Sequence, residues 1–500
     1  MARSRSSSTS GSSLSFRGSR EDMGSTTPST VSRTLVSEST PLLPLKEPTY
    51  EGYTVSEVKD EIWETLYHAA PIFGSQILEY SLIAASVVSI GHISTEALAA
   101  SALGSMTAGV TGLSIITGFA CALDSLLPHA WTGGNPQHVG LWSQRMVVLL
   151  SMITAPIVLL WLNAESILLK LKQEPEVARM AGLYLQWFTL SLPGQCITIV
   201  ARRFYQAQGR SHIPTIIMTF IAAVNALLNW LLVWGPEPIR LGFIGAPIAS
   251  SISFDLMALI YIVHAYFINS PEARHPMNYL CLQELGKLFR LGLSSTGQIA
   301  SEWWCWEIVA LAASQLGPIP LAAQSVLLTS ANVVYMAPFS VSLATSIRVG
   351  NALGSGQARK AKLAAETAIG MSIFIAMLIS ATYMTFRKNW SYMFNDDQEV
   401  LFDCGTTIMD GVLRARGKLA FGAIVNILSY YVFGIPVGIS LAFWAKFGLA
   451  GLWMGLSAAM FCSAVVSIAA VCVTDWDREV AKTRARLGQS DDVASGTTPV

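Results

Sequence analysis

The sequence predicts an all-α polytopic membrane protein made of two six-helix lobes in parallel repeat, and three observations lead to this fold class. Of the 500 residues, 52% are hydrophobic and only 13% are charged, against about 25% charged residues in a typical soluble domain. The charges gather at the termini and in short connections, and the apolar stretches between them reach about 20 residues, enough for a helix to cross a bilayer. The third observation is that the two halves of the chain carry matching turn motifs.

The apolar stretches predict membrane-spanning helices, because backbone polar groups in lipid must be satisfied within their own segment. Six stretches in the first half begin near Ile62, Glu96, Met146, Val177, Ile213 and Phe243. Five in the second half begin near Leu291, Leu321, Leu363, Leu419 and Leu449. A further candidate between Val400 and Gly417 is a poor span, because it carries Asp403, Asp410, Arg414 and Arg416.

Three turn motifs recur in the same order in the two halves. The pairs are Thr132-Gly133-Gly134 with Gly354-Ser355-Gly356, Gln208-Gly209 with Arg416-Gly417, and Leu241-Gly242-Phe243-Ile244-Gly245 with Phe447-Gly448-Leu449-Ala450-Gly451. Six spans repeated in parallel are typical of secondary transporters. The repeat predicts about 12 spans.

The same comparison exposes a gap in the second half. Val177 and Gly209 are 32 positions apart, whereas the matching residues Val400 and Gly417 are only 17 apart, so about 15 residues are missing after Val400. We therefore expect a truncated tenth span. The short form is either a splice variant or gene-model product, or a chain whose tenth span is half present.

These spans define the expected domain organisation. It comprises a disordered Ser/Thr-rich cytoplasmic tail (1–55), an N-lobe with spans 1–6 (56–268), a central cytoplasmic connection (269–290), a C-lobe with spans 7–12 (291–474) and a cytoplasmic tail (475–500). With a cytoplasmic N-terminus and twelve crossings, the inner connections hold twice as many Lys and Arg residues as the outer ones, as the positive-inside rule requires. Glu38, Leu42 and Leu43 fit an acidic dileucine motif for a sorting adaptor, although a chance Leu pair fits equally well.

Composition excludes several classes of protein. The formal net charge is zero, which gives no electrostatic case for a nucleic-acid partner. The seven cysteines are scattered, and their spacing matches neither a disulfide framework nor a metal site. We interpret them as packing residues. The chain has no HExxH motif and no Walker-A loop, which argues against an enzyme or an ATP-driven pump. We expect no cofactor, only H+ or Na+ as a coupling ion.

The densest cluster of ionisable residues inside a span runs from Ser301 to Glu307. Such residues are costly in hydrocarbon and therefore mark functional sites. Glu302 and Glu307 point roughly 140° apart on a helix. A carboxyl in a half-dry cavity can hold a proton and release it when a cation arrives, and Trp303 could stack on that cation. The alternative is that the acids pair with polar neighbours such as Gln298 and the tryptophans line the membrane interface. We prefer the functional interpretation, with Glu307 slightly favoured.

Other polar residues within spans favour structural roles. Asp124, at the end of the second span, would cap the next turn or pair with a basic residue as part of an inner gate. Glu79 and Asp255 are lone acids, each as easily paired as functional. Asn225 and Asn229 share one helix face and suit hydrogen bonds between helices.

Longer motifs resemble a known family. They are Tyr335-Met336-Ala337-Pro338-Phe339 continuing to Arg348-Val349-Gly350-Asn351-Ala352-Leu353-Gly354, the acidic stretch Glu302 to Glu307, Gly411-Val412-Leu413-Arg414, Gly422-Ala423-Ile424-Val425-Asn426 with Tyr430-Tyr431, and Gly434-Ile435-Pro436-Val437-Gly438. From about Glu61 to Asp475 the chain resembles eukaryotic multidrug and toxic compound extrusion (MATE) transporters. Its Ser/Thr-rich tail with a dileucine resembles fungal members.

This resemblance implies two six-helix lobes around a cavity open to one side at a time, and export of organic cations or other xenobiotics against protons or sodium. Glu302 and Glu307 would handle protons and cations beside Gln298 and Trp303, with Asp403 as their partner in the second lobe. Arg348 and Asn351 would join Asp124 and Asn225 in gate or structural roles. The expected protein is a monomer in the vacuolar or plasma membrane.

Two departures from the family's pattern, and two rival functions, stay open. The family usually has Gln where this chain has His129, so the inner gate is expected to differ. The gap after Val400 falls where the tenth span should begin, which puts the role of Asp403 in doubt. One rival is a lipid-type flippase on the same fold, which would favour a basic cavity. The other is an inactive or regulatory product that assembles with a full-length partner, which only the gap supports.

Overall fold

The computed structural model describes residues 52–268, 271–390 and 416–494. By its internal contacts the chain divides into Met1–Gly52 and Tyr53–Val500, and all the helices given below belong to the second unit. Three predicted features lie outside the described residues. They are the sorting residues Glu38, Leu42 and Leu43, the acid Asp403, and nearly all of the predicted tenth span.

Within the described residues, the first group of helices runs from α1 to α10. Its members are α1 (Val55–Gly91), α2 (Thr95–Ala108), α3 (Ser114–Ala120), α4 (Leu123–Thr132), α5 (Gln137–Leu162), α6 (Ala164–Lys170), α7 (Pro175–Phe188), α8 (Leu192–Ala207), α9 (His212–Trp234) and α10 (Gly245–Val263). A π-helical turn, η1 (Gly109–Leu113), joins α2 to α3, and a 3-10 turn, η2 (Thr189–Ser191), joins α7 to α8.

The second group runs from α11 to α17. Its members are α11 (Leu285–Ser314), α12 (Pro318–Gly354), α13 (Ala358–Trp390), α15 (Leu419–Ile427), α16 (Ile435–Ile439) and α17 (Leu449–Cys472). The π-helical turns η7 (Leu428–Gly434) and η8 (Ser440–Trp444) flank α16. The helix α18 (Trp476–Ala494) follows α17.

Nine helical stretches among the described residues are long and apolar enough to cross a membrane. They are Val55–Gly91, Thr95–Thr132, Gln137–Leu162, His212–Trp234, Gly242–Ile268, Ala331–Gly354, Ala358–Ala381, Leu419–Trp444 and Leu449–Cys472. Two more, residues 175–207 and α11, have spanning length but carry charged side chains. Together they coincide with the eleven apolar stretches predicted from the sequence, and the all-α polytopic fold class is confirmed.

The first helix begins earlier than its apolar stretch. Thr54 and Glu57 form a capping box, in which the Thr54 hydroxyl accepts from the Glu57 N–H and the Glu57 carboxylate accepts from the Thr54 N–H at 2.9 Å. Such a box satisfies backbone donors that a helix start leaves unpaired. The helix therefore begins at Val55, in polar sequence that hydrophobicity alone does not reveal.

The internal repeat is visible in the backbone. The matched turn motifs place a glycine with positive φ at the same position in each half, a conformation that side-chain-bearing residues rarely adopt. The pairs are Gly134 (98°) with Gly356 (76°), Gly209 (73°) with Gly417 (65°), and Gly242 (61°) with Gly448 (60°). The glycines that suggested the repeat are thus required by the turns themselves.

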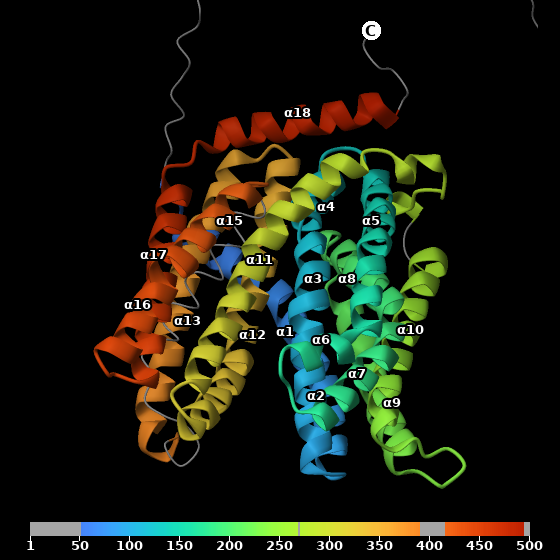
Figure 1. Ribbon diagram of the computed structural model, residues 1–500. Helices are drawn as coiled ribbons and strands as arrows, with labels where there is room; N and C mark the ends of the chain where they lie inside the picture. Colours follow the sequence, from blue (N-terminus) through green and yellow to red (C-terminus); the bar gives the residue numbers. More distant parts are fainter. Residues whose placement is uncertain (1–51, 269–270, 391–415, 495–500) are drawn as a thin grey trace, which may run out of the picture. The chain divides into compact units, whose positions relative to one another are not determined.

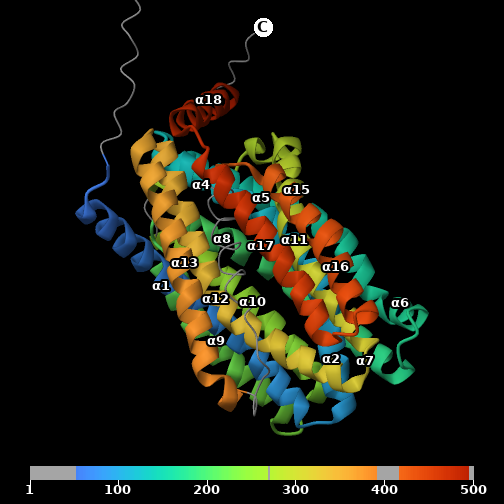
Figure 2. The same cartoon turned by 90° about the vertical axis from the view of Figure 1, so that its left-hand side faces the viewer.

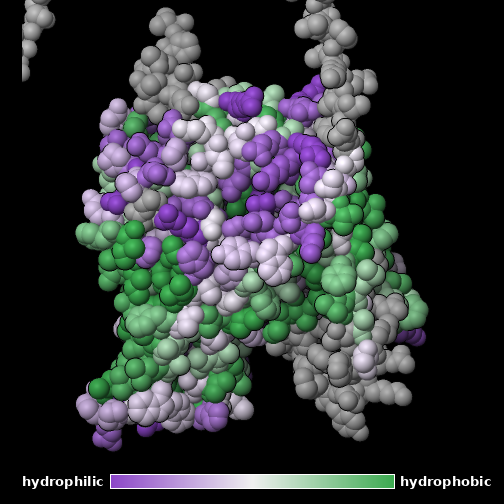
Figure 3. Space-filling model, turned by 180° about the vertical axis from the view of Figure 1, so that it is seen from behind, coloured by the Kyte–Doolittle hydropathy of each residue, from purple (hydrophilic) through white to green (hydrophobic). Residues whose placement is uncertain are grey.

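The two groups of helices come together at the end of the bundle that α18 crosses, called the α18 end below (Figure 1). They diverge toward the opposite end, and the side view shows α18 lying across the helix ends (Figure 2). From behind, hydrophilic side chains gather toward the α18 end and hydrophobic ones cover most of the surface below (Figure 3). This distribution fits a bundle embedded in lipid with α18 at a polar boundary.

Candidate functional site

The acidic stretch of α11 lies against a buried polar layer formed by α15, η7 and α17. Asn426 donates from Nδ2 to the backbone oxygen of Gln298 at 3.3 Å and accepts from Ser463 Oγ at 2.8 Å. One turn further along α11, the Tyr431 hydroxyl donates to the Ser301 backbone oxygen at 2.9 Å. These bonds fix the segment of α11 that carries Glu302, which is itself buried.

Gln298 is fully buried, and neither its Oε1 nor its Nε2 atom has a hydrogen-bond partner within the described residues. Only a glycine fits opposite it, because a Cβ on Gly422 would lie 2.6 Å from Gln298 Nε2. An unsatisfied buried amide costs about 1–3 kcal/mol, so this group is available to a ligand. The structure therefore places Gln298 one helical turn from Glu302, in the polar interior as the sequence suggested.

Glu307 lies on a different side of α11 and is half-buried. Among the described residues it makes no hydrogen bond or ion pair. Its neighbour Trp306 instead packs edge-on against Trp453, with ring centroids 5.5 Å apart, and Trp453 donates from Nε1 to Gln324 at 2.7 Å. A carboxyl without a partner on a rigid helix is free to exchange a proton.

The tryptophans of the acidic stretch keep exposed surface. Trp303 is 37% exposed and Trp304 is 41% exposed. Trp304 donates from Nε1 to the backbone oxygen of Val110 at 3.2 Å, which links α11 to η1 of the first group. The structure does not give Trp303 a comparable bond among the described residues, so its ring is available for stacking.

The predicted polar residues of the first group lie in clusters of their own. Asp124 on α4 forms an ion pair with Arg203 on α8 at 3.0 Å, and both are buried. Arg203 also donates to the sulfur of Cys121 at 2.9 Å. Glu79 is held by two hydrogen bonds from Arg202, at 2.6 and 2.7 Å. Each acid thus has a cation within its own group of helices.

Asn225 and Asn229 lie in a neutral network that joins α1, α9 and α10. Asn225 donates to Ser253 at 3.0 Å, Asn229 donates to Asn225 Oδ1 at 3.1 Å, and the Ser86 hydroxyl donates to Asn229 at 3.3 Å. All of these side chains are buried. The network bonds three helices without an ionised group, which suits a structural role.

The motif Arg348 to Gly354 on α12 contacts three helices of the first group, and we name these contacts the α12 interface. Arg348 pairs with Glu61 of α1 through two bonds, at 2.9 and 2.6 Å. Asn351 accepts from Thr132 of α4 at 2.8 Å through its backbone oxygen, and its side chain donates to Ala207 of α8 at 3.5 Å.

Close backbone packing completes the α12 interface. A Cβ on Gly350 would lie 2.8 Å from Pro128 of α4, and a Cβ on Gly354 would lie 2.8 Å from the backbone oxygen of His129. Near the same end, Arg359 of α13 forms two bonds with Glu57 of α1, at 2.7 and 3.0 Å. The α18 end is therefore closed by ion pairs and by helices at near-backbone contact.

Sequence reasoning assigned Arg348 and Asn351 to gate or structural roles but missed their partners. Glu61 is separated from Arg348 by 287 positions, and Glu57 from Arg359 by 302. The available signal was the cluster of acids at the start of the first span, facing basic residues in connections on the same predicted side. The role of the α12 interface in gating remains a prediction.

Comparison with known proteins identifies the family. A family model described as MatE matches residues 71–231 and 295–440. An uncharacterized transporter of Schizosaccharomyces pombe is 33% identical over 451 residues, covering 87% of this chain and 84% of the relative. Multidrug and toxin extrusion protein 1 of Xenopus tropicalis is 33% identical, covering 86% and 77%. This chain belongs to the MatE family.

Solved structures agree with this assignment. The crystal structure of the eukaryotic MATE transporter AtDTX14 matches with a TM-score of 0.81 and 28% identity, covering 86% of this chain and 99% of that one. The Vibrio cholerae MATE transporter VcmN in its bent form matches with a TM-score of 0.73 at 16% identity, which shows the shared fold. The chain is thus a membrane transporter of the MatE family and not an enzyme, and its resemblance to eukaryotic members is confirmed.

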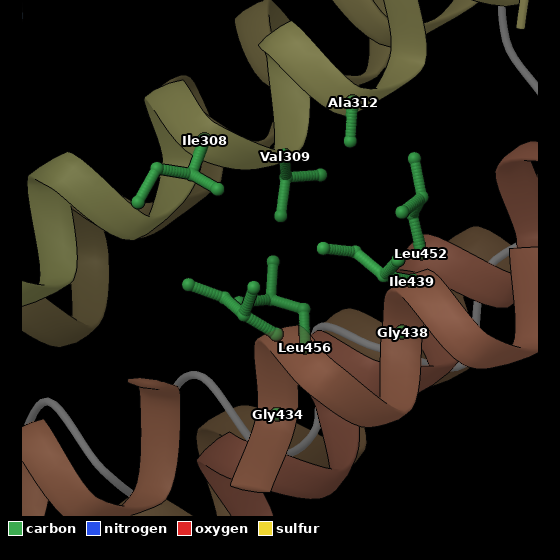
Figure 4. Close-up of a pocket in the computed structure, with 9 residues that line it drawn as sticks. Ile308, Val309, Ala312, Gly434, Gly438, Ile439, Leu452 and Leu456 are labelled. Atoms are coloured by element: carbon green, nitrogen blue, oxygen red, sulfur yellow. The ribbon is translucent and has the colours of Figure 1, made fainter. Parts of the chain in front are cut away.

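In this MatE protein a pocket lies between α11, α16 and α17, and its α11 residues directly follow the acidic stretch (Figure 4). Apolar side chains of Ile308, Val309, Leu452 and Leu456 line it beside Gly434 and Gly438. Its free volume of about 10 Å³ is near the minimum for one water, and an apolar void of this kind stays dry. Drug-sized ligands need roughly 300–1,000 Å³, so this pocket is a packing void and not the transport site.

No group of three or more His, Cys, Asp or Glu side chains that could hold a metal ion occurs within the described residues of this MatE protein. The polar atoms that could bind a cation are instead spread along α11, from Gln298 to Glu307. From the described part of the chain, an ion held there would meet one or two carboxylates.

Proposed function

We propose that this chain is a secondary antiporter that exports organic cations or related xenobiotics in exchange for protons. The observation that carries the proposal is the half-buried Glu307 on α11, which has no partner among the described residues and lies on the same helix as the buried Glu302 and the exposed ring of Trp303. The names of the relatives support the substrate class, since several are called multidrug and toxin extrusion proteins.

The chemistry of the site supports protons over sodium. Hard metal cations are bound by several oxygen ligands, whereas a proton needs a single carboxyl. The two acids of α11 lie on different sides of the helix, and Gln298 adds one neutral oxygen to the side of Glu302. A protonated Glu307 would be neutral while the cavity is empty and would lose its proton as a cation approaches Trp303.

We also propose the organisation predicted from the sequence. The N-lobe (56–268) and the C-lobe (291–474) would move as two bodies, joined by the cytoplasmic connection 269–290. The protein would act as a monomer in the vacuolar or plasma membrane, with an adaptor reading Glu38, Leu42 and Leu43 in the tail. Asp403 would serve as a third acid of the C-lobe, beside Glu302 and Glu307.

Export can be tested in cells that lack their own drug exporters. Cells expressing the full chain are expected to survive concentrations of ethidium, a planar organic cation, that arrest cells with an empty vector. A fluorescent fusion confirms that the chain reaches the membrane, and retained dye is measured by cytometry. Equal sensitivity and equal dye retention, with the chain correctly placed, would contradict export and favour the inactive or regulatory product.

A further inference from the structure

The helix α18 is a long element with no role in the proposed transport chemistry. It begins at Trp476, where Asp475 caps it by accepting from the Arg478 N–H at 3.1 Å, and it lies across the α18 end of the bundle (Figures 1 and 2). One face of α18 is buried on the bundle and the other is exposed. Its contacts reach both groups of helices.

The first half of α18 is anchored on the second group. Trp476 and Val480 are buried in a core cluster made mostly of α12 and α13 side chains, which also includes Ala69 and Ile72 of α1. The helix α18 itself packs on α12 and α13. Glu479 is 5% exposed and faces Lys482 at 3.1 Å, Lys418 at 3.4 Å and Arg416 at 3.9 Å. Burial acts to raise the pKa of Glu479, but the hydrogen bond from Lys482 and the charges of Lys418 and Arg416 outweigh it and leave the pKa below its ordinary value.

Arg416 strengthens this anchor from the side of α15. Its guanidinium lies 5.6 Å from the ring centroid of Trp476, in cation–π geometry, and donates to the Ala470 backbone oxygen at 3.4 Å. The arginine is almost fully buried. Two large apolar side chains and a buried charge cluster thus fix α18 to the second group.

The second half of α18 reaches the first group through much less contact. Leu487, which is half-buried, packs on Gly133 at the end of α4, where its Cδ1 atom occupies the space that a Cβ would need. One residue earlier, Arg486 lies over Gly417 of the second group, and a Cβ on Gly417 would be 2.7 Å from its Nη1. Among the side chains that the structure describes, Leu487 is thus an apolar contact of α18 with α4.

With this contact, α18 bridges the α12 interface. The same turn of α4 that meets Leu487 also packs on α12, through Thr132 and His129 against Gly354. If the two groups separate at the α18 end, a rigid helix attached to both cannot follow both. The weaker attachment, at Leu487, must break first, because the anchor at Trp476, Glu479 and Val480 buries more apolar surface and pairs a charge.

We propose that α18 is a latch that holds the α18 end closed, with Trp476, Glu479 and Val480 as its fixed anchor and Leu487 as its releasable contact. Opening at this end requires Leu487 to leave the turn at Gly133. The inference concerns the conformational cycle and does not depend on the substrate or the coupling ion.

The latch can be tested by measuring how often the α12 interface opens. Ser346 is fully buried on α12, one turn before Gly350 and on the same face. A Ser346→Cys reporter in the full chain, purified in lipid nanodiscs, should react with a maleimide only when α4 and α12 separate. The labelling rate of the same chain without the reporter is subtracted, because the chain contains native cysteines.

We expect Leu487→Ala to raise the labelling rate at position 346 by roughly three- to tenfold, the effect of losing part of the burial of one leucine. Leu487→Met, which keeps the volume, and Ala485→Ser, on the exposed face, should label like the parent. Thermal unfolding measured in parallel should show all variants folded to similar temperatures. Equal labelling rates in Leu487→Ala and Leu487→Met would overturn the latch, as would faster labelling accompanied by global unfolding.

Discussion

Replacing Glu307 by Gln is expected to reduce ethidium export in proteoliposomes to the level of protein-free liposomes. The amide keeps the size of the side chain but cannot release a proton, so the exchange cycle has no carrier at this position. Glu307 makes no hydrogen bond or ion pair with the described residues, so its loss should leave the fold intact. Export is measured as the initial rate of dye movement after a pH gradient is imposed.

Two control variants sharpen this expectation. Glu307→Asp keeps a carboxyl and should retain part of the rate, with an altered dependence on pH. Glu302→Gln removes the other acid, which lies in the buried layer with Gln298, and separates a contribution of Glu302 from that of Glu307. Full activity of the Glu307→Gln variant would show that Glu307 is not the coupling acid.

Replacing Arg348 by Met should destabilise the closed form more than any other single change at the α12 interface. The substitution leaves Glu61, which is 4% exposed, without its bidentate partner, and breaking a buried ion pair typically costs about 3–5 kcal/mol. We expect a lower unfolding temperature of the purified protein, together with faster labelling of the Ser346→Cys reporter.

The double variant Glu61→Gln with Arg348→Met provides the matched control. It removes both charges, so no uncompensated carboxylate remains, and it should recover a large part of the stability lost in Arg348→Met. The coupling between the two changes is read from a double-mutant cycle. Purely additive effects would contradict a direct interaction between Glu61 and Arg348.

The sequence was informative wherever structure follows from local pattern. Apolar stretches located the eleven spans in the described residues, and paired glycines located turns whose backbone needs positive φ. The polar character of the segment around Glu302, and the shared helix face of Asn225 and Asn229, also follow from residue types within single helices. These features depend on neighbours close in the chain, and periodicity records such neighbours.

The contacts that close the molecule could not be found in this way. Glu61 meets Arg348 only because α1 crosses to the second group, and the sequence alone does not fix that crossing. The docking of α18 depends equally on tertiary packing, since the polar sequence from position 475 onward predicted only a cytoplasmic tail. Whether Glu307 has a partner is likewise a property of the packed bundle.

Substrate-driven proton movement is the most direct test of proton-coupled export by this chain. The purified full chain is reconstituted in liposomes that contain a pH-sensitive dye and ethidium, in sodium-free buffer. Imposing an inward proton gradient should drive ethidium out and acidify the lumen faster than in liposomes without ethidium, and the Glu307→Gln variant should show neither effect. Ethidium export without acidification, or export that needs added sodium, would contradict the proposed proton coupling.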